Sequence, residues 1–220
     1  MTARVVEDDE SGRRIAVDVL RGGGLVALPT DTVYGIAVDL GTPDGIDRLF
    51  AAKRRPPDKG IMLLLHEATQ AAGIGIMTPA ASALAAACWP GGLTVVVPQR
   101  PDVSLPPALT AGTRTIGLRV PDHPAPRALA AGVGPLPTTS ANRSGEPEAT
   151  DAAGILAQLG DAVDLVLDGG TAHGGPASTV VDCTGDSAQI LRIGAISAAR
   201  IEGILEAAGQ HLDPGPAGSR

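Results

Sequence analysis

The chain contains only two lysines, and both lie in one short basic segment. Lys53 is followed directly by Arg54 and Arg55, two prolines then restrict the backbone, and Lys59 ends the segment. Clustered cations offset the repulsion among phosphate oxygens, so this segment is a candidate clamp for a polyphosphate. The alternative is a solvated loop after a helix, whose cations are favoured by the helix C-terminus. The spacing alone leaves both interpretations open.

Two other segments concentrate small hydrogen-bonding side chains. Residues 29–35 contain two threonines, an aspartate and a tyrosine, and they follow an apolar run that predicts a buried strand. Strand ends in α/β sheets border ligand crevices, so these side chains could converge on a ligand, and the alternative is a capped turn. Residues 138–145 offer threonine, serine and asparagine groups suited to phosphate or ribose, although such runs also form ordinary loops.

Several common catalytic motifs are missing from the sequence. It has no P-loop, no complete Gly-x-Gly-x-x-Gly fingerprint and no Gly-x-Ser-x-Gly nucleophile elbow. Cys88 and Cys183 are 95 residues apart and the four histidines are scattered, which argues against a zinc site and a disulfide framework. We therefore expect no protein-bound metal site. A bound nucleotide would be held by residues other than those of a P-loop or a Gly-x-Gly-x-x-Gly turn.

Composition narrows the class of protein. A chain of 220 residues with 44% hydrophobic content can bury a full core, and we expect one domain over residues 1–212 and a disordered tail over 213–220. Only 1% of the residues are aromatic and the net charge is −7, which disfavours base stacking and broad attraction to nucleic acid or anionic membranes. The acidic start and the lack of any apolar run near ~18 residues predict a cytoplasmic protein without membrane contact.

The apolar periodicity predicts an α/β domain built on a mixed sheet. We expect helices at 11–21, 43–53, 79–88, 126–131, 150–159 and 197–208, and strands at 25–28, 61–65, 93–97, 115–120, 163–167, 179–182 and 189–192. Ser11 and Thr42 are the expected N-caps of the first two helices. No helical pattern separates the third and fourth strands, which favours antiparallel pairing between them. Alternation along the fourth strand places Arg119 opposite the core.

Taken in order, seven short segments resemble the YrdC family of L-threonylcarbamoyladenylate synthases. The resemblance extends from about residue 22 to residue 196 and rests on segments 29–35, 53–56, 89–94, 119–122, 140–145, 178–182 and 191–194. Each segment alone is ordinary, and their shared order makes the resemblance specific. Because only 28 residues follow Arg192, the resemblance predicts the short, single-domain form of the family.

The resemblance implies a fold, an activity and partners. Enzymes of the family combine L-threonine, bicarbonate and ATP into threonylcarbamoyl-AMP, pyrophosphate and water, which supplies the group later placed on the tRNA adenosine beside the anticodon. The resemblance therefore implies three partners: Mg²⁺ bound with ATP, a tRNA-modifying threonylcarbamoyl transferase complex that acts downstream, and a weak contact with tRNA. The implied fold is a single YrdC-like domain, a twisted mixed sheet with flanking helices around a large concave basic cavity.

The resemblance also implies roles for individual residues. A carbamate must attack the α-phosphate of ATP, so two anionic partners need cations between them, and a guanidinium fork suits the carboxylate of threonine. The implied catalytic residues are Lys53, Arg55, Ser140 and Asn142; ATP-binding falls to Lys53, Arg55, Lys59, Thr115, Ser140, Asn142 and Arg192; and threonine-binding falls to Thr32, Arg119, Thr138 and Ser178.

Two residues depart from the family pattern, and two other functions are alternatives. Arg54 has no implied role, and His66 stands a position or two out of register with a threonine-contacting histidine of some members. YrdC-like domains also occur in carbamoyl-phosphate-dependent carbamoyltransferases, which are longer and carry zinc-finger cysteines that two cysteines cannot supply. An RNA-binding or ribosome-assembly factor is the other alternative, and the charge of −7 counts against it.

Overall fold

The computed structural model describes residues 3–56, 60–172 and 175–213, whose strands form one sheet. The strands are β1 (Arg4–Glu7), β2 (Val26–Leu28), β3 (Gly35–Ala37), β4 (Met62–Leu64), β5 (Leu93–Pro98), β6 (Thr115–Arg119), β7 (Leu136–Ser140), β8 (Leu165–Asp168), β9 (Thr179–Asp182), β10 (Ala188–Arg192) and β11 (Leu212–Asp213). Their order across the sheet is β1-β8-β2-β3-β7-β4-β6-β5-β9-β10-β11. Parallel and antiparallel neighbours both occur, so the predicted mixed sheet is confirmed.

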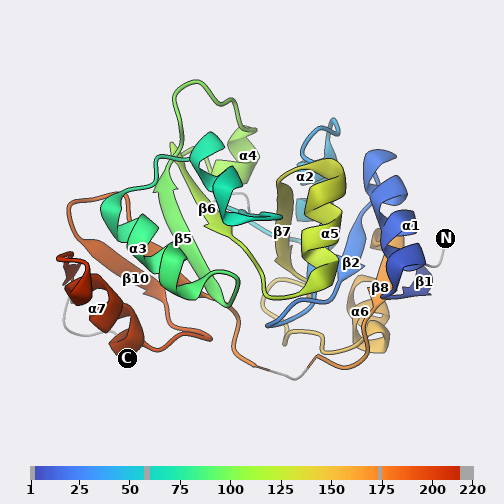
Figure 1. Ribbon diagram of the computed structural model, residues 1–220. Helices are drawn as coiled ribbons and strands as arrows, with labels where there is room; N and C mark the ends of the chain where they lie inside the picture. The colour runs from blue at the N-terminus through green and yellow to red at the C-terminus, as the bar shows by residue number, and fades with distance from the viewer. Residues whose placement is uncertain (1–2, 57–59, 173–174, 214–220) are drawn as a thin grey trace.

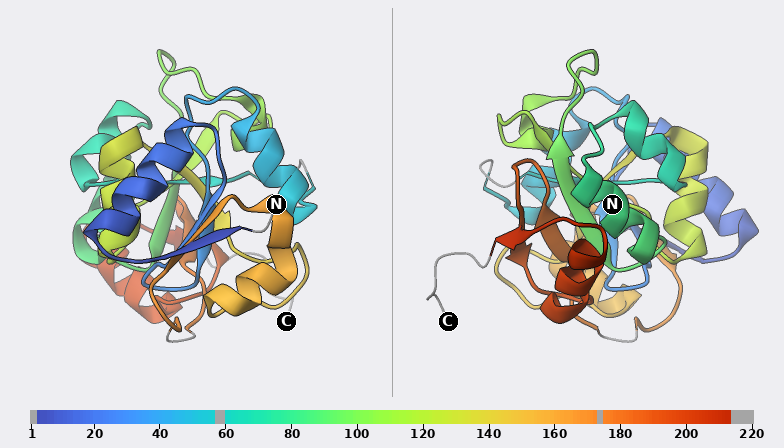
Figure 2. Two further views of the ribbon diagram at one scale, coloured as in Figure 1. Left: turned by 90° about the vertical axis from the view of Figure 1, so that its right-hand side faces the viewer. Right: turned by 60° about the vertical axis from the view of Figure 1, so that its left-hand side comes forward.

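Helices cover both faces of this sheet. They are α1 (Glu10–Arg21), α2 (Gly45–Lys53), α3 (Pro79–Cys88), α4 (Pro107–Thr110), α5 (Pro124–Val133), α6 (Ala152–Leu159) and α7 (Ala198–Ala207), with 3₁₀ turns at Ala68–Gly73 and Gly160–Ala162. Figure 1 shows α1, α5 and α3 on the side of the sheet that faces the viewer, and the left panel of Figure 2 shows α2 and α6 on the opposite side. The predicted α/β layering is therefore confirmed.

Strand pairing brings distant parts of the chain together. β5 pairs antiparallel with β6, as predicted, and parallel with β9. β8 pairs with β1 and β2 near the other edge, so six strands separate β8 from β9, its successor in the chain. After β8 the chain therefore crosses the sheet, and β9 and β10 are added beside β5 near the opposite edge.

The first two helices begin at residues other than the predicted caps. Asp9 caps α1, because its carboxylate accepts a hydrogen bond from the Gly12 amide at 2.7 Å, and Ser11 lies inside the helix. Asp44 precedes α2, while Thr42 lies in the preceding turn, where its carbonyl accepts from the Gly45 amide at 3.3 Å. In both regions the chain offers several residues able to cap, and the local backbone decides among them.

The sequence pattern missed four of the described strands, namely β1, β3, β7 and the two-residue β11. β1 is an edge strand of four residues with only one exposed and one half-buried valine, and β3 has three residues. β7 lies inside the sheet between β3 and β4, yet it contains Pro137 and ends in Thr138, Thr139 and Ser140. Proline and hydroxyl residues are unusual in a central strand, so composition concealed it.

The core is aliphatic and lies on both faces of the sheet. One cluster joins α1 and α5 to the sheet through residues such as Leu20, Leu129 and Leu64, and a larger one holds Leu84, Leu118 and their neighbours. In the part of the chain that the structure describes, no helix has the length and apolar composition needed to cross a membrane. Asp213 pairs with Gln189, so the predicted tail begins too early, and 214–220 lie outside the described residues.

Candidate functional site

A cavity of about 440 Å³ lies over the middle of the sheet, beside α4 and the segment that follows α2. Three alternate residues of β6 line it, namely Thr115, Gly117 and Arg119, because every second side chain of a strand points to the same face, and Ile116 of the same strand also reaches it. Thr94 and Val96 of β5 line it in the same way. The cavity therefore forms on one face of β5 and β6, which places the predicted residues Thr115 and Arg119 together.

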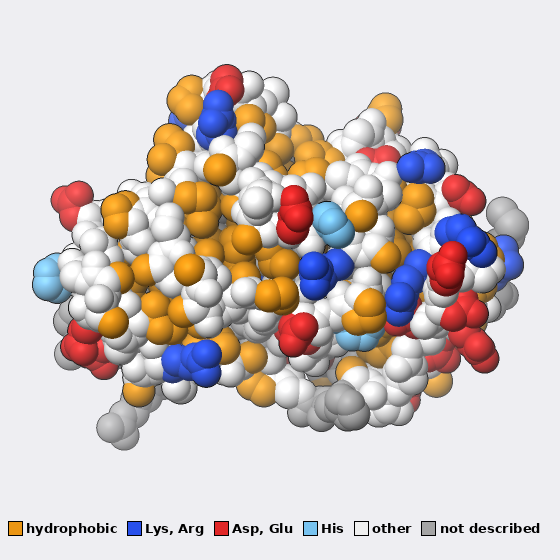
Figure 3. Space-filling model, in the orientation of Figure 1, with side chains coloured by type: hydrophobic (Ala, Val, Ile, Leu, Met, Phe, Trp, Pro, Cys, Tyr) orange, Lys and Arg blue, Asp and Glu red, His pale blue; other side chains and the backbone are white. Residues whose placement is uncertain are grey.

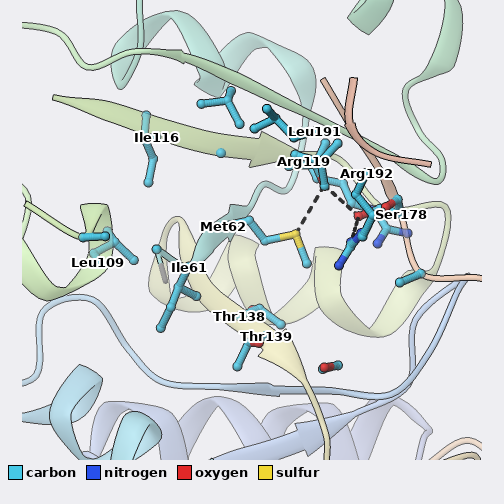
Figure 4. A pocket seen from close by; sticks show the side chains of 18 of the residues that line it. Ile61, Met62, Leu109, Ile116, Arg119, Thr138, Thr139, Ser178, Leu191 and Arg192 are labelled. Carbon is cyan, nitrogen blue, oxygen red and sulfur yellow. Dashed lines mark hydrogen bonds between the residues drawn. The ribbon is translucent and has the colours of Figure 1, made fainter. Parts of the chain in front are cut away.

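The two ends of the cavity differ in polarity (Figure 4). Arg119, Ser178 and Arg192 gather at one end, where hydrogen bonds join Ser178 to Arg192. Leu109 and Ile116 lie toward the other end and give its wall apolar side chains. A ligand with a charged part and an apolar or planar part could match this division.

Lys53, the last residue of α2, holds the loop that follows β7. Its ammonium donates to the carbonyl oxygens of Ser140 and Asn142 and, at 3.1 Å, to Oδ1 of Asn142, so each of its three N–H groups has an acceptor. The side chain is 1% exposed. Burial and then the nearby charge of Arg55 lower the pKa of Lys53 to about 8. The ammonium thus faces the loop, behind the cavity wall.

The loop after β7 is internally hydrogen-bonded around Asn142. The Ser140 hydroxyl donates to Oδ1 of Asn142 at 2.6 Å, and Nδ2 of Asn142 donates to the carbonyl of Glu146 at 2.7 Å. The Ser144 amide donates to the carbonyl of Lys53 at 3.0 Å, which closes the loop onto α2. Ser140 lines the cavity, so Lys53 and Asn142 fix the position of a residue that a ligand can reach.

Arg55 brings a cation to the cavity wall. Its Nη2 donates to the carbonyl of Gly60 at 2.8 Å, and its guanidinium carbon lies 6.0 Å from the centre of the Phe50 ring, within cation–π range. Glu148 lines the cavity too. The described lining thus contains three arginines and one glutamate, and the predicted basic character of the cavity depends on these arginines.

Arg119 is buried and joins three segments of the chain. Its Nη2 donates to Oδ1 of Asp31 at 2.6 Å, Nη1 donates to the Thr32 hydroxyl at 3.1 Å, and Nε donates to the Gly91 carbonyl at 2.9 Å. A guanidinium has five N–H groups, so one remains on each terminal nitrogen for a ligand. Burial lowers the pKa of Arg119 and the adjacent Asp31 carboxylate opposes this shift. Arg119 does lie on the cavity face, as alternation predicted, but it is 1% exposed.

Ser178 and Arg192 form a second hydrogen-bonded group. Arg192 donates from Nε and Nη2 to the Ser178 carbonyl at 3.1 and 2.8 Å, and from Nη2 to the Ser178 hydroxyl at 3.2 Å. The Ser178 hydroxyl also lies 2.9 Å from the Thr94 hydroxyl. Thr138 lines the same cavity, and its hydroxyl donates to the Leu136 carbonyl at 2.9 Å.

The family model of Sua5, YciO and YrdC proteins, described as telomere recombination, matches residues 18–194. The chain belongs to the Sua5/YciO/YrdC family. The resemblance found in the sequence is therefore confirmed.

Curated relatives in this family include threonylcarbamoyl-AMP synthases. The chain is 35% identical over 202 residues to the one from Bacillus subtilis, covering 91% of this chain and 58% of that protein. It is 39% identical over 202 residues to a putative one from Mycobacterium leprae, covering 90% and 91%. The chain thus spans little more than half of the first relative and nearly all of the second.

Among solved structures, Sua5 of Pyrococcus abyssi complexed with L-threonine matches with a TM-score of 0.86 at 30% identity, covering 96% of this chain and 62% of that one. YciO of Escherichia coli matches with a TM-score of 0.80 at 25% identity, covering 90% and 98%. The YrdC-like fold predicted from the sequence is therefore confirmed.

The structure divides the residues implied by the Sua5/YciO/YrdC resemblance into three groups. Those that line the cavity are Thr32, Arg55, Thr115, Arg119, Thr138, Ser140, Ser178 and Arg192. Lys53 and Asn142 lie behind the lining and support Ser140. Lys59 lies outside the described residues. Most implied residues therefore meet around one cavity, although they come from segments spread over nearly the whole chain.

Sequence reasoning missed several residues of this site. Asp31 lies in the segment for which a capped turn was the alternative to a ligand site, and its carboxylate pairs with Arg119, a partner 88 residues away. Met62, Thr94 and Glu148 also line the cavity. Thr94 could have been found, because it ends the family segment 89–94, whereas Met62 sits in an apolar run without any polar signal.

The lowered pKa of Lys53 predicts a pH effect on the binding of ATP, the ligand that the family resemblance assigns to this loop. Below about pH 8 the ammonium satisfies three acceptors of the loop, and above it the neutral amine has only two N–H groups. The dissociation constant for ATP, measured by titration calorimetry from pH 6.5 to 9.5, should therefore rise as pH increases through about 8. Lys53→Ala should bind ATP more weakly with no pH dependence in this range, and an equal slope in both proteins would contradict this role.

Proposed function

We propose that the chain is an L-threonylcarbamoyladenylate synthase, which converts L-threonine, bicarbonate and ATP into threonylcarbamoyl-AMP, pyrophosphate and water. The observation that carries the proposal is one cavity that gathers Arg55, Arg119 and Arg192 with the Ser140 loop. A relative of which the chain covers 94% bears the name threonylcarbamoyl-AMP synthase, one of closely similar length is named a putative one, and a Sua5 structure of the same fold holds L-threonine. The proposed reaction is the one that such a cationic cavity suits.

The charges of the reactants explain why arginines surround the cavity. Condensation of the threonine amine with bicarbonate gives a carbamate anion and water. An oxygen of this carbamate then attacks the α-phosphate of ATP, and pyrophosphate leaves. Two anions must approach each other, so fixed cations that meet the developing charge lower the barrier. Arg55 and Arg192 would meet the phosphates, and Lys59, outside the described residues, is proposed to join them.

The two ends of the cavity suit different parts of the substrates. Thr32, Arg119, Thr138 and Ser178 are proposed to bind threonine, with the remaining N–H groups of Arg119 directed to its carboxylate. Thr115, Ser140 and the wall near Leu109 are proposed to bind ATP. The adenine base of ATP would lie on aliphatic side chains, because the sequence contains very few aromatic residues.

Mg²⁺ is proposed to enter with ATP. It would offset charge on the triphosphate, and a carboxylate oxygen is a suitable ligand for this hard cation. Glu148, the carboxylate in the described lining, is the side chain that fits this requirement. The protein groups themselves bind and orient the anions.

The proposed partner is the tRNA-modifying transferase complex that consumes threonylcarbamoyl-AMP, with at most a weak tRNA contact. Figure 3 shows the face formed by α3, α5 and α1, where basic and acidic side chains are interspersed. Interspersed charges give little net attraction to a polyanion at physiological salt, so this face supports no extended nucleic-acid surface.

Pyrophosphate release tests the proposal directly. We expect release from ATP only when L-threonine, bicarbonate and Mg²⁺ are all present, because the attacking carbamate exists only after the first two combine. A coupled phosphate assay in bicarbonate-depleted buffer, with bicarbonate added back, measures this dependence. Equal rates with and without bicarbonate would indicate ordinary amino-acid adenylation, and turnover supported only by carbamoyl phosphate would indicate a carbamoyltransferase.

A further inference from the structure

Hydrogen bonds join three side chains that line the cavity, Met62, Thr94 and Ser178, and Figure 4 labels Met62 and Ser178. The Thr94 hydroxyl of β5 donates to the sulfur of Met62 in β4 at 3.4 Å. On its other side the same hydroxyl lies 2.9 Å from the hydroxyl of Ser178. Thr94 and Ser178 are 3% and 1% exposed. Either hydroxyl of this pair could donate to the other, so the direction depends on their remaining partners.

A glycine of β6 lies between Met62 and Thr94 and leaves room for their contact. β6 separates β4 from β5 in the sheet, and Gly117 is the β6 residue at this point. A Cβ on Gly117 would lie 3.3 Å from Cγ2 of Thr94 and 3.4 Å from Cβ of Met62. The missing side chain leaves room for contact across the strand, so the contact depends on this sequence position.

Counting hydrogens shows how Ser178 faces the cavity. A threonine hydroxyl has one hydrogen, and that of Thr94 is directed to Met62. The bond between the two hydroxyls must then use the hydrogen of Ser178. The Ser178 oxygen already accepts from Nη2 of Arg192, which leaves one lone pair and no hydrogen for a ligand. Ser178 therefore presents a hydrogen-bond acceptor to the cavity.

We propose that Met62 and Thr94 are positioning residues that hold Ser178 as an acceptor for an N–H or O–H group of the amino-acid substrate. The proposal rests on the proposed function, which places threonine beside Ser178. An acceptor at this point favours the amine, the carbamate N–H or the side-chain hydroxyl of threonine. It disfavours a carboxylate, carbamate or phosphate oxygen, because two acceptors would face each other.

The first test replaces Thr94 in two ways and measures threonine binding by calorimetry and the KM values in the pyrophosphate assay. Thr94→Val keeps the shape but removes the hydroxyl, so Ser178 is free to turn, and the Kd and KM for threonine should rise roughly 3- to 10-fold. The KM for ATP should stay within about twofold. Thr94→Ser keeps the hydroxyl and should restore threonine binding close to that of the parent protein.

The second test asks whether Met62 acts through Thr94. Met62→Leu keeps an apolar side chain of similar size but removes the sulfur acceptor, so Thr94 can donate to Ser178 and reverse the chain. The Kd for threonine should rise by a similar factor. The Met62→Leu/Thr94→Val double variant should match Thr94→Val alone, because coupled residues give non-additive effects. Independent packing defects would instead multiply.

Comparison of L-threonine with L-2-aminobutyrate identifies the donor group. If the threonine hydroxyl is the donor, the Thr94→Val effect should disappear with 2-aminobutyrate, and if an N–H is the donor it should persist. Both results support the proposal. Unchanged threonine affinity in Thr94→Val, a Thr94→Ser variant as weak as Thr94→Val, or an equal rise in the ATP KM would each overturn it.

The two proposals can fail separately. A parent protein that binds threonine but releases no pyrophosphate would refute the proposed function. Calorimetry would still test the hydrogen bonds that join Met62, Thr94 and Ser178. A parent protein with full bicarbonate-dependent turnover and a neutral Thr94→Val change would refute this inference alone. A parent protein that binds no threonine would refute both.

Discussion

Lys53→Ala should lower kcat/KM for ATP by at least ~100-fold, because a misplacement of about 1 Å at a reacting site can cost that much even when the mutated residue lies behind it. The expected cause is indirect. Without the ammonium, the carbonyls of Ser140 and Asn142 and the Asn142 side chain lose their donor in a buried place. Ser140 would then leave the position that Lys53 gives it at the cavity wall. Steady-state kinetics at pH 7 would measure the loss.

Two neighbouring arginines provide the controls for Lys53. Arg55→Ala should show a similar loss of kcat/KM, because Arg55 lines the cavity. Arg54→Ala should have a much smaller effect, because Arg54 is exposed at the end of α2 and is outside the described lining. Circular dichroism and the Tm would show whether each variant is folded. Equal losses for Arg54 and Arg55 would contradict a positioned clamp and indicate a diffuse basic patch.

Asp31→Asn should both destabilise the protein and raise the KM for threonine. The change keeps the shape of the side chain but leaves the buried guanidinium of Arg119 without its counter-charge. Breaking a buried ion pair by removing one partner costs about 3–5 kcal/mol, which corresponds to a fall in Tm of roughly 10 °C for a protein of this size. Arg119 and Thr32 share this network, so the threonine end of the cavity should change while the KM for ATP should not.

An exposed ion pair of the same chemistry is the matched control. Asp102 pairs with Arg100 through two hydrogen bonds at 2.9 and 2.7 Å, and both side chains are largely exposed. Asp102→Asn should leave the Tm and both KM values unchanged, because exposed pairs are screened by solvent. Equal small shifts in Tm for the two variants would mean that the Asp31–Arg119 pair has no special structural role.

Local patterns were enough to predict most of the elements but not all of their ends. α3 begins and ends where the sequence pattern places it, because Thr78 caps it, Pro79 suits its first turn and Trp89-Pro90 stops it. β7 was missed because its hydroxyl side chains face a cavity, so it lacks the apolar alternation of a strand. The hydroxyl residues that make the site polar thus remove the apolar pattern from which β7 could have been predicted.

The candidate site shows the same division between local and distant information. The resemblance selected residues that meet at the cavity, such as Arg119 and Ser178. It named Lys53 but not the supporting role of this residue, and it named neither Asp31 nor Met62, because these three residues act through partners 32 to 89 residues away along the chain. Sequence spacing carries no record of such contacts, which exist only after the strands have assembled in their non-sequential order.

Because the chain crosses the sheet between β8 and β9, the residues of two walls of the cavity are translated at different times. Lys53, Arg55 and Ser140 emerge from the ribosome well before Ser178 and Arg192, which belong to the segment beyond the crossing. β9 docks on β5, so the late segment adds to a sheet whose other strands are already made. The wall around the Ser140 loop is thus translated first, and the wall that holds Ser178 and Arg192 closes last. A nascent chain interrupted after β8 would leave the cavity open on the side that Ser178 and Arg192 occupy.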